Sequence, residues 1–476
     1  MEAKRKSEHP LRDNIEVMVF AVAMALGLKV FALEAYQIPT GSMQPTLMGT
    51  GLLDPDRNVS GGGVHDRVLV DKLTYLLRDP KRWEVSVFRY PLATVNNYVK
   101  RVVGLPGEKL WIRHGDLWAK PEGGDEGFQI LRKPASLQKH LWKLVRPLPG
   151  SPPAAWSGWR RSGAFEPGVD GPLNLVGRAN VELRVPVRDD YRDGYPAGIR
   201  SRIPISGGAA TSHKVVSDLK VGFQATPRAG GGTLHLRCDF GAYPVHLEIP
   251  ADKEKEIRIA LPDEESVTLE GISLPGEPIS CEVAFWDHHL EVHLESGNRE
   301  AVFIRDFTLE PVRSSQNSIR FSTEEGGWTL ELPALWRDIH YLSPLNGGTP
   351  VFEIPDGHYF MMGDNTQNSL DSRDWEARVL VFDPPVDGVA ELRGDFLRHG
   401  SDPFYDNPRW NGEGSLMTFR DRWGSLHTLT RDDLKGSKDR REHSPLVPRR
   451  FILGKATAVF LPIPPFSPVA RIGLVH

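Results

Sequence analysis

The hydrophobic pattern of the chain opens with one apolar run close to the N-terminus. Residues 17–28 are all apolar or small, and a largely apolar stretch continues to Ile38. A helix needs about 20 residues to cross a bilayer, and residues 17–38 supply that length. Basic residues precede the run, so the positive-inside rule predicts a cytoplasmic segment 1–16 and a single-pass transmembrane anchor over 17–38. The rest of the chain would then lie outside the cytoplasmic (inner) membrane.

Two alternatives explain the apolar run less well. A cleavable signal peptide cut after Ala35 would need a small residue where Leu33 stands. A buried helix of a soluble protein fits the length and the flanking charges less well than an anchor does.

Most of the chain beyond residue 38 carries short segments in which apolar and polar residues alternate, the period of β-strands. Clear examples lie at 181–185, 233–237, 245–249 and 290–294, with turns between them. We therefore predict a mainly β protein with an inserted β-sandwich-like domain over about 171–311. Within it, Asp287 and His288 would turn one hairpin.

One amphipathic helix is predicted after Pro134. Its apolar residues Leu137, Leu141, Leu144 and Val145 follow one another at i, i+4, i+7 and i+8. From 147 to 168 the chain is rich in Pro, Gly, Ser and Trp without periodicity, which indicates a linker or an irregular surface segment.

Composition changes this picture little. The 476 residues allow two or three domains, and a formal net charge of −4 spread over both signs provides no basic surface for nucleic acid. Two cysteines are present, Cys238 and Cys281. They leave two alternatives open, one disulfide or two small buried apolar residues.

Three histidines near residue 290 raise the question of a metal site. His289 and His293 are four residues apart, as are two ligands on a metal-binding helix, and His288 precedes them. The local pattern is that of a strand, however, in which residues four apart lie about 13 Å from each other. We therefore expect solvated side chains and no metal there.

Candidate chemistry lies in two blocks that follow the apolar run. Residues 37–46 contain Ser42, and residues 98–108 contain Lys100 within a β-branched strand. A serine nucleophile needs a base to remove its proton. A free lysine titrates near pH ~10.4, so neutralising Lys100 at pH 7 costs roughly 4–5 kcal/mol, which burial among apolar neighbours would have to offset. Arg101 should point to the opposite face of the strand.

A third block, residues 363–373, completes the set. In this order and behind an N-terminal apolar segment, the three blocks resemble the bacterial type I signal peptidases, membrane-bound serine proteases that use a lysine base. The resemblance covers about 17–120, 358–375 and 448–462. It implies a coiled β-sheet catalytic core that is interrupted by insertions.

The resemblance also implies roles for single residues. Ser42 would be the nucleophile and Lys100 the general base, Thr40 an oxyanion donor together with the Ser42 backbone N–H, and Ser369 the group that orients Lys100. Five residues would line a shallow pocket for a small P1 side chain: Ile38, Pro39, Met43, Leu47 and Val99. Asp371 and Arg373 are expected to support the site as a salt bridge and not to react.

The chain departs from the family in two residues and in its length. His65 stands where the family has a flexible glycine, and it would be strained if that position requires a positive φ. Thr366 replaces a typical arginine and removes an ion pair. The long separation of the second and third blocks requires an insertion. The predicted divisions are a cytoplasmic segment 1–16, an anchor 17–38, core residues 39–120, a first insertion 121–345, core residues 346–378, a second insertion 379–447, and a final core strand and tail 448–476.

These inferences predict a signal peptidase I-like endopeptidase that removes signal peptides from exported preproteins at the outer face of the lipid bilayer. It would prefer Ala-x-Ala sites and need no metal or organic cofactor. The ligand of the sandwich is unknown. One alternative is a self-cleaving repressor, which fits poorly because such proteins lack an anchor and carry a DNA-binding domain. The other is a membrane-tethered binding protein with an inactive core, which the presence of Ser42 and Lys100 argues against.

Overall fold

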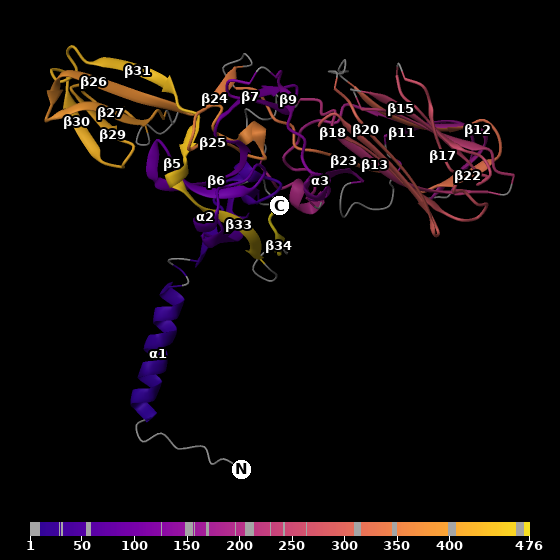
Figure 1. The fold of residues 1–476 in the computed structure, drawn as a ribbon, viewed down its shortest axis with the longest axis horizontal. Coiled ribbons are helices and arrows are strands. Elements are labelled where there is room, and N and C mark those ends of the chain that lie inside the picture. The colour runs from indigo at the N-terminus through magenta and orange to yellow at the C-terminus, as the bar shows by residue number, and fades with distance from the viewer. Residues whose placement is uncertain are drawn as a thin grey trace.

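The computed structural model describes residues 10–27, 29, 32–53, 59–124, 126–147, 156, 158–167, 171–195, 197–204, 214–228, 230–240, 243–262, 264–308, 316–344, 350–397, 406–462 and 471–476. The fold is mainly β, as the alternating pattern predicts. A central group of sheets lies between two lateral groups of strands, and one helix extends from the central group (Figure 1).

That helix, α1 (Pro10–Gly27), carries exposed apolar side chains along residues 15–24. It ends well before Ile38. Residues Leu33–Gln37 form strand β1 instead, so the predicted anchor over 17–38 is wrong for these five residues. An apolar composition does not distinguish a helix from an edge strand, and here the backbone groups of β1 pair with a neighbouring strand. None of the helices in the described ranges combines the length and the apolar character needed to cross a membrane.

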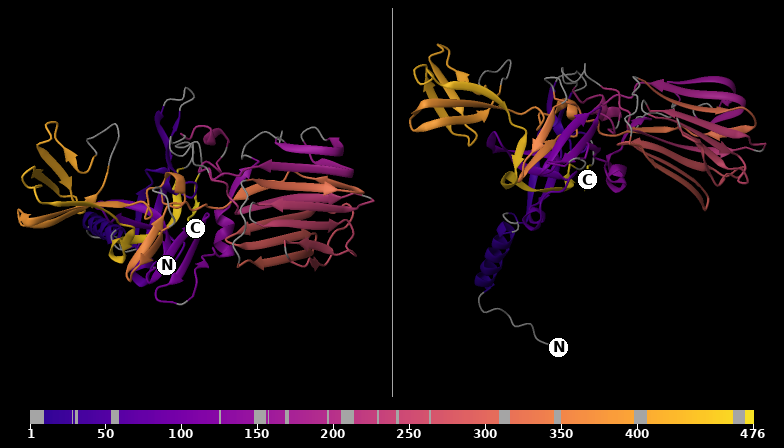
Figure 2. Two further views of the ribbon diagram at one scale, coloured as in Figure 1. Left: turned by 90° about the horizontal axis from the view of Figure 1, so that it is seen from above. Right: turned by 45° about the horizontal axis from the view of Figure 1, so that its top comes forward.

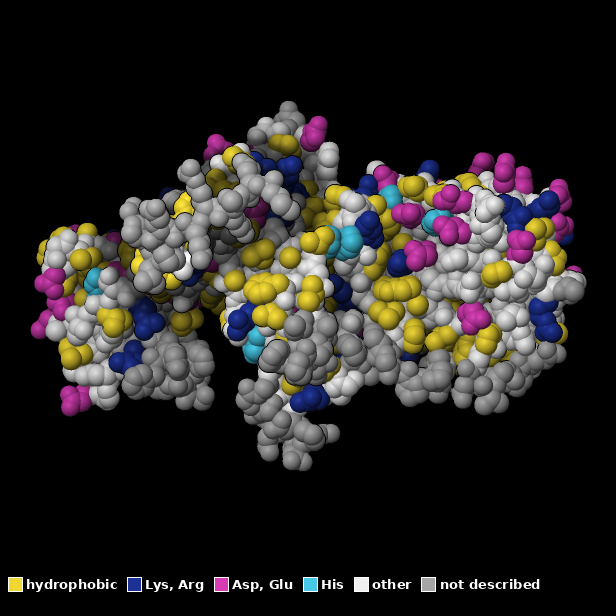
Figure 3. Space-filling view, turned by 90° about the horizontal axis from the view of Figure 1, so that it is seen from below, with side chains coloured by type: hydrophobic (Ala, Val, Ile, Leu, Met, Phe, Trp, Pro, Cys, Tyr) yellow, Lys and Arg dark blue, Asp and Glu magenta, His cyan; other side chains and the backbone are white. Residues whose placement is uncertain are grey.

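The central sheet contains the strand that carries most of the second sequence block and the strand after which the third block begins. Its order is β1, β4 (Arg67–Asp71), β33 (Ile452–Leu461), β5 (Val85–Tyr90), β6 (Ala93–Gly104), β25 (His358–Met362) and β32 (Leu446–Pro448), with β34 (Gly473–Leu474) paired to β33. Strand β33, from near the C-terminus, therefore lies between β4 and β5, which come from the first hundred residues. Seen from the side from which α1 leaves, hydrophobic side chains gather on the surface of this central part (Figure 3).

Smaller elements complete the central part. One four-stranded sheet has the order β24 (Val351–Ile354), β7 (Glu108–Arg113), β8 (Asp116–Pro121) and β9 (Gln129–Ile130), and a hairpin joins β2 (Gly49–Leu53) to β3 (Val59–His65). Helix α2 (Leu73–Leu77) follows β4. The predicted helix after Pro134 is present as α3 (Ala135–Leu141), but it is shorter than predicted because Leu144 and Val145 belong to strand β10 (Lys143–Arg146).

The first insertion contains a large sheet whose strands lie side by side (Figure 2). Its order is β17 (Val267–Leu269), β16 (Ile257–Ala260), β15 (Pro244–Pro250), β14 (Thr233–Asp239), β21 (Asn317–Thr323), β12 (Leu173–Val185), β22 (Gly327–Leu330), β13 (Leu219–Pro227), β18 (Ile279–Trp286), β19 (His289–Ser296) and β20 (Arg299–Asp306), with β10, β11 (Trp159–Pro167) and β23 (Ala334–Arg337) paired at its sides. The strands extend beyond the predicted range 171–311 on both sides. Strand β11 falls where we predicted an irregular segment, because its pairing with β12 stabilises a sequence that lacks alternation.

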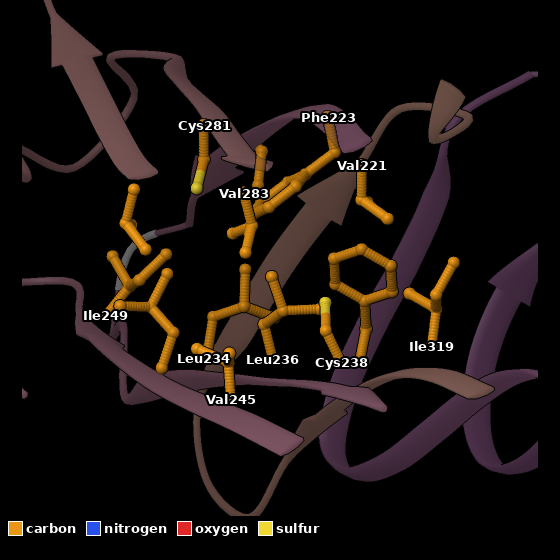
Figure 4. Packing of buried hydrophobic residues seen from close by; sticks show 14 of the residues in the cluster. Val221, Phe223, Leu234, Leu236, Cys238, Val245, Ile249, Cys281, Val283 and Ile319 are labelled. Atoms are coloured by element: carbon orange, nitrogen blue, oxygen red, sulfur yellow. The ribbon is translucent and has the colours of Figure 1, made fainter. Parts of the chain in front are cut away.

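This sheet folds into two layers that enclose one apolar core. Side chains of β13 and β18 face those of β14, β15 and β21 in the close view (Figure 4). Cys238 and Cys281 belong to this core as free, buried thiols, which agrees with the second of the two alternatives. The hairpin turn at Asp287 and His288 is confirmed: both residues adopt a positive φ, of 45° and 58°, between β18 and β19.

The second insertion forms two small three-stranded sheets around their own apolar cluster. Their strands are β27 (Val389–Asp395), β26 (Glu376–Val386) and β31 (Lys438–His443) in one sheet, and β28 (Arg409–Trp410), β29 (Leu416–Arg420) and β30 (Leu426–Thr430) in the other. They lie on the opposite side of the central part from the first insertion (Figure 1).

Candidate active site

Ser42 and Lys100 meet although they come from different elements. Ser42 lies in the short 3-10 helix η2 (Gly41–Met43), and Lys100 lies in the middle of β6. The Lys100 Nζ to Ser42 Oγ distance is 2.5 Å. The lysine side chain is almost fully buried, and this burial lowers its pKa to about 8, although the carboxylates of Asp371 and Asp364 oppose the shift. A neutral amine in contact with a hydroxyl can remove its proton.

The pair opens into a cavity of about 600 Å³. Its lining includes Ile38, Pro39 and Val99, three of the five residues predicted for the pocket. Met43 and Leu47 do not line it. Both are fully buried in the apolar cluster that also holds Ile38 and Val87, because the turn after Ser42 directs them inward. The lining also includes residues that the sequence did not single out for the pocket: Tyr36, Gln37, Gly41, Val87, Asn97, Tyr98, Gln367, Asn368 and Leu370.

Thr40 and Ser369 also line this cavity, in different environments. Thr40 is exposed and its side chain makes no capping hydrogen bond to η2. Ser369 is buried, and its hydroxyl has no hydrogen-bond partner among the described residues, so the expected bond to Lys100 is not made. A Cβ added to Gly363 would fall closer than 3.0 Å to both the Ser369 hydroxyl and the Ser42 carbonyl oxygen. Glycine is therefore needed there for the third block to approach Ser42.

The third block is held by a buried ion pair. Arg373 Nε lies 3.1 Å from Asp371 Oδ1, and both side chains are buried. The other oxygen of Asp371 accepts a hydrogen bond from the Gly363 backbone N–H, while the Arg373 guanidinium donates to the carbonyls of Thr366 and Ser369. These contacts fix the loop on which Ser369 stands. They fit the expected supporting role of the two residues.

A second ion pair lies on the other side of β6. Arg101 donates to both carboxylate oxygens of Asp364, at 2.8 and 2.6 Å, and both side chains are inaccessible to solvent. Burial opposes the ionisation of Asp364, but the Arg101 guanidinium keeps the pKa of that carboxyl below its ordinary value. Arg101 also donates to the carbonyls of Trp83 and His476. The expected placement of Arg101 on the face opposite to Lys100 agrees with these contacts.

Asn365 joins the first and third blocks directly. Its backbone N–H donates to the Ser42 carbonyl at 3.1 Å, and its side-chain amide donates to the Gly41 carbonyl at 2.8 Å. These bonds place the backbone on both sides of the Ser42 hydroxyl in a defined position. The two bonds therefore fix the position of Ser42 relative to the third block.

The first insertion contacts the same loop. Gln367 donates its side-chain amide to the Asp189 carbonyl, and Thr366 donates to the His340 carbonyl at 2.7 Å. The Asp189 carboxylate in turn lies 3.2 Å from Arg337 of β23. The replacement of arginine by Thr366 thus leaves a polar link to the insertion at this position. His65 does not appear among the described residues with positive φ, so the anticipated strain is absent, and its Nδ1 lies 3.1 Å from the Ile38 carbonyl.

Comparison with known protein families identifies the family to which this chain belongs. A family model described as signal peptidase, peptidase S26, matches residues 11–129 and 272–392, half of the chain, and these ranges include Ser42, Lys100 and Ser369. The chain belongs to the signal peptidase family S26. The match leaves residues 130–271 outside, which contain α3 and the first strands of the inserted sheet.

Individual relatives in the signal peptidase family match over shorter ranges. A probable signal peptidase I-2 of Synechocystis sp. is 31% identical over 134 residues, which cover 26% of this chain and 55% of that protein. Signal peptidase I of Pseudomonas aeruginosa is 38% identical over 122 residues, 22% of this chain and 38% of that protein. The chain spans about half the length of the Synechocystis and Leptolyngbya relatives that it matches.

The comparison with solved structures gives likenesses of low identity and low TM-score. A winged bean acidic lectin complexed with methyl-alpha-D-galactose aligns with 38% of this chain and 93% of its own, at 10% identity and a TM-score of 0.27.

Two features of this signal peptidase family site were missed by sequence reasoning. The Arg101–Asp364 pair joins residues 263 positions apart, and Asn365 reaches back over 324 positions to Gly41. Asp364 and Asn365 stand in the third block, and Arg101 directly follows Lys100. Their positions in the sequence, beside the proposed catalytic groups, could have indicated that they belong to the site.

Proposed function

We propose that this chain is a Ser/Lys endopeptidase that cleaves signal peptides from preproteins after small P1 residues. Membership of the signal peptidase family supports the reaction class. The observation that carries the mechanism is the 2.5 Å contact between Lys100 Nζ and Ser42 Oγ at the wall of an open cavity.

In the proposed first step, neutral Lys100 accepts the hydroxyl proton of Ser42 while the serine oxygen attacks the scissile carbonyl carbon. The carbonyl oxygen becomes an oxyanion, for which the Ser42 backbone N–H and the Thr40 hydroxyl are the proposed donors. Lys100 then passes the proton to the leaving amine, and an acyl-enzyme forms on Ser42. In the second step a water molecule gives a proton to Lys100 and attacks the ester carbonyl. The bond from that carbon to Ser42 Oγ then breaks, Lys100 returns the proton to the serine oxygen, and the acyl part leaves with a free carboxyl group.

Substrate would enter as an extended strand beside the two segments that line the cavity, residues 36–42 and 97–100. Ile38, Pro39 and Val99 offer apolar surface next to the nucleophile. Ser369 is the proposed partner of Lys100 once substrate excludes water. Its hydroxyl lines the cavity and is not engaged elsewhere among the described residues.

The proposed location is the membrane that preproteins cross, with the N-terminus in the cytoplasm and the catalytic part outside. Support comes from the exposed apolar side chains of α1 and from the hydrophobic surface on the side where α1 leaves (Figure 3). Fractionation of cells that express the chain with and without residues 1–27 tests it. The full chain should sediment with membranes and resist high salt, and the shortened chain should be released.

The direct test is cleavage of a preprotein with an Ala-x-Ala site by the detergent-solubilised full chain. Ser42→Ala and Lys100→Met should lower the rate roughly 10⁴-fold or more, because each removes a member of one catalytic unit. Lys438→Met is the matched control, since Lys438 is an exposed lysine of β31 in the second insertion. Cleavage by the parent and the control alone supports the peptidase, whereas absence of cleavage by all four proteins would favour the binding-protein alternative.

A further inference from the structure

Two histidines and a glutamate share the outer face of strands β14 and β15 in the first insertion. The strands alternate strictly, with Leu234, Leu236 and Leu247 buried in the core. His235, His246 and Glu248 occupy the intervening positions and are half-buried on the other face. Side chains that alternate in this way project to one side of the sheet.

The register of the two strands brings the three side chains together. His235 is the direct partner of Glu248 across the pair, and His246 lies two residues before Glu248 on the same strand. Directly opposite residues have Cβ atoms about 4.5–5.5 Å apart. One ligand atom from each of the three side chains lies within 4.8 Å of the others, and the two imidazole centroids are 5.6 Å apart.

The donor set suits a transition metal. Zinc takes imidazole nitrogens and carboxylate oxygens at about 2.0–2.2 Å, so neighbouring ligands of a tetrahedral ion lie roughly 3.4 Å apart. His235 Nδ1 and Glu248 Oε1 are 3.9 Å apart, too far for a hydrogen bond and close to that spacing. We propose that His235, His246 and Glu248 form a binding site for a divalent transition-metal ion, for which zinc is the best match.

Two other groups of side chains in the described residues could also ligate a metal, but neither contains two imidazoles. His293, Glu295 and Glu300 offer one imidazole, and its Nε2 already lies 2.7 Å from Glu300. The buried group of Asp116, Asp218 and Asp287 offers carboxylates alone, and Lys133 pairs with Asp287 at 2.6 Å. The pair of imidazoles distinguishes the proposed site.

Two neighbouring arginines should weaken the affinity of this site for a metal ion. Arg237 is the partner of His246 across β14 and β15, and Arg258 is the partner of Glu248 across β15 and β16. Both are exposed, and their positive charges oppose the binding of a cation. Three protein ligands also leave a coordination position open for water or for a group from another molecule. The site is separate from the proposed catalytic pair, which lies between η2 and β6.

Isothermal titration calorimetry, in which zinc chloride is added to the metal-free full chain, tests the site. The parent should bind one zinc ion at this site, and His235→Ala or His246→Ala should bind it more than about tenfold more weakly, because one of three ligands is lost. His293→Ala is the matched control and should bind like the parent. Arg258→Gln should bind zinc more tightly. Far-UV circular dichroism checks that each variant keeps its strands.

Cobalt(II) gives a second readout, since visible absorption typical of four- or five-coordinate cobalt should appear with the parent and the control and not with His235→Ala. Equal zinc binding by the parent and by the doubly substituted His235→Ala, His246→Ala chain would overturn the proposal. So would preferential binding of magnesium or calcium, which select oxygen ligands. Cleavage of preprotein by Ser42 is not expected to depend on the outcome.

Discussion

Lys100 and Arg101 are sequence neighbours on β6 whose side chains hold different parts of the molecule. Lys100 Nζ contacts Ser42 Oγ at 2.5 Å, whereas Arg101 forms a fully buried ion pair with Asp364. Alternation along the strand separates the two cations, so that one is desolvated without an ion-pair partner and the other is fully paired. This separation allows one buried cationic side chain to lose its proton while the other stays charged.

The pH dependence of cleavage follows from the lowered pKa of Lys100. The general base must be neutral, so kcat/KM should rise about tenfold per pH unit below a pKa of about 8 and level off above it. Burial favours the neutral amine, which is why the rise ends far below the titration range of a free lysine near pH ~10.4. Initial rates with a preprotein substrate across this range measure the profile.

A profile without an ascending limb near pH 8 would contradict the assignment of Lys100 as the base. Ser42→Cys is the companion variant. Its thiol has an ordinary pKa near ~8.5, so its profile should no longer report Lys100 alone.

Removal of Arg101 should destabilise the core strongly. Arg101→Met would leave the Asp364 carboxylate buried without its partner, and breaking a buried pair in this way costs about 3–5 kcal/mol. Urea unfolding followed by tryptophan fluorescence measures the change. The double variant Arg101→Met, Asp364→Leu should recover part of the loss, because no unpaired charge remains; equal losses in the single and double variants would argue against the pair.

Much of the site was predictable from the sequence because its parts are local. The strand pattern around Lys100 and the turn residues around Ser42 stand in short blocks, and these blocks resemble one family closely enough to propose a nucleophile and a base. Which side chains line the pocket was less predictable. Met43 and Leu47 look like pocket residues in the sequence, but the turn buries both.

The parts that sequence reasoning missed depend on long-range pairing. Leu33–Gln37 continues an apolar run, and only its pairing with β4 makes it a strand. Strand β11 lacks an alternating pattern and is ordered by β12. His235 and Glu248 both stand in segments recognised as strands, yet their proximity depends on a register that neither segment specifies alone.

Ser369 should matter more for catalysis than for stability. Its hydroxyl is buried without a hydrogen-bond partner among the described residues, so Ser369→Ala removes no observed bond and should change the melting temperature little. If the hydroxyl orients Lys100 in the substrate complex, kcat of Ser369→Ala should fall roughly 10- to 100-fold. This loss is smaller than the one expected on removing the general base itself, because general acid–base catalysis contributes about 10²- to 10⁴-fold. Single-turnover cleavage measures this step. An unchanged rate would remove Ser369 from the proposed mechanism.

Gly363 should tolerate no side chain. A Cβ there would meet the Ser42 carbonyl oxygen and the Ser369 hydroxyl closer than 3.0 Å, and the backbone oxygen cannot rotate away. Gly363→Ala should therefore move the third block away from Ser42 and abolish cleavage. Gly473→Ala is the matched control, because the added methyl group would meet nothing within 4 Å. Full activity of Gly363→Ala would show that the block need not approach the serine so closely.

The first insertion should affect catalysis through residues 189–203. Ile199 of helix α4 (Ala197–Arg200) belongs to an apolar cluster with Met48, Leu52 and Val64, the residues that follow the Ser42 turn. Asp189, at the start of the same segment, accepts the hydrogen bond from Gln367 in the third block. One segment of the insertion thus contacts both sides of the proposed active site.

Ile199→Ala should therefore lower kcat/KM as well as stability. Truncation of a buried isoleucine costs about 2–5 kcal/mol, and here the loss falls on the segment that supports Met48 and Leu52. Ile259→Ala, in the core of the inserted sheet, is the matched control: it removes the same atoms from a fully buried site of another cluster and should lower the melting temperature without changing cleavage. If both variants cleave at the parental rate while both melt earlier, the insertion stabilises the chain but does not position the site. The expected difference between them arises because Ile199, unlike Ile259, packs in one cluster with Met48 and Leu52, which follow Ser42 in the chain.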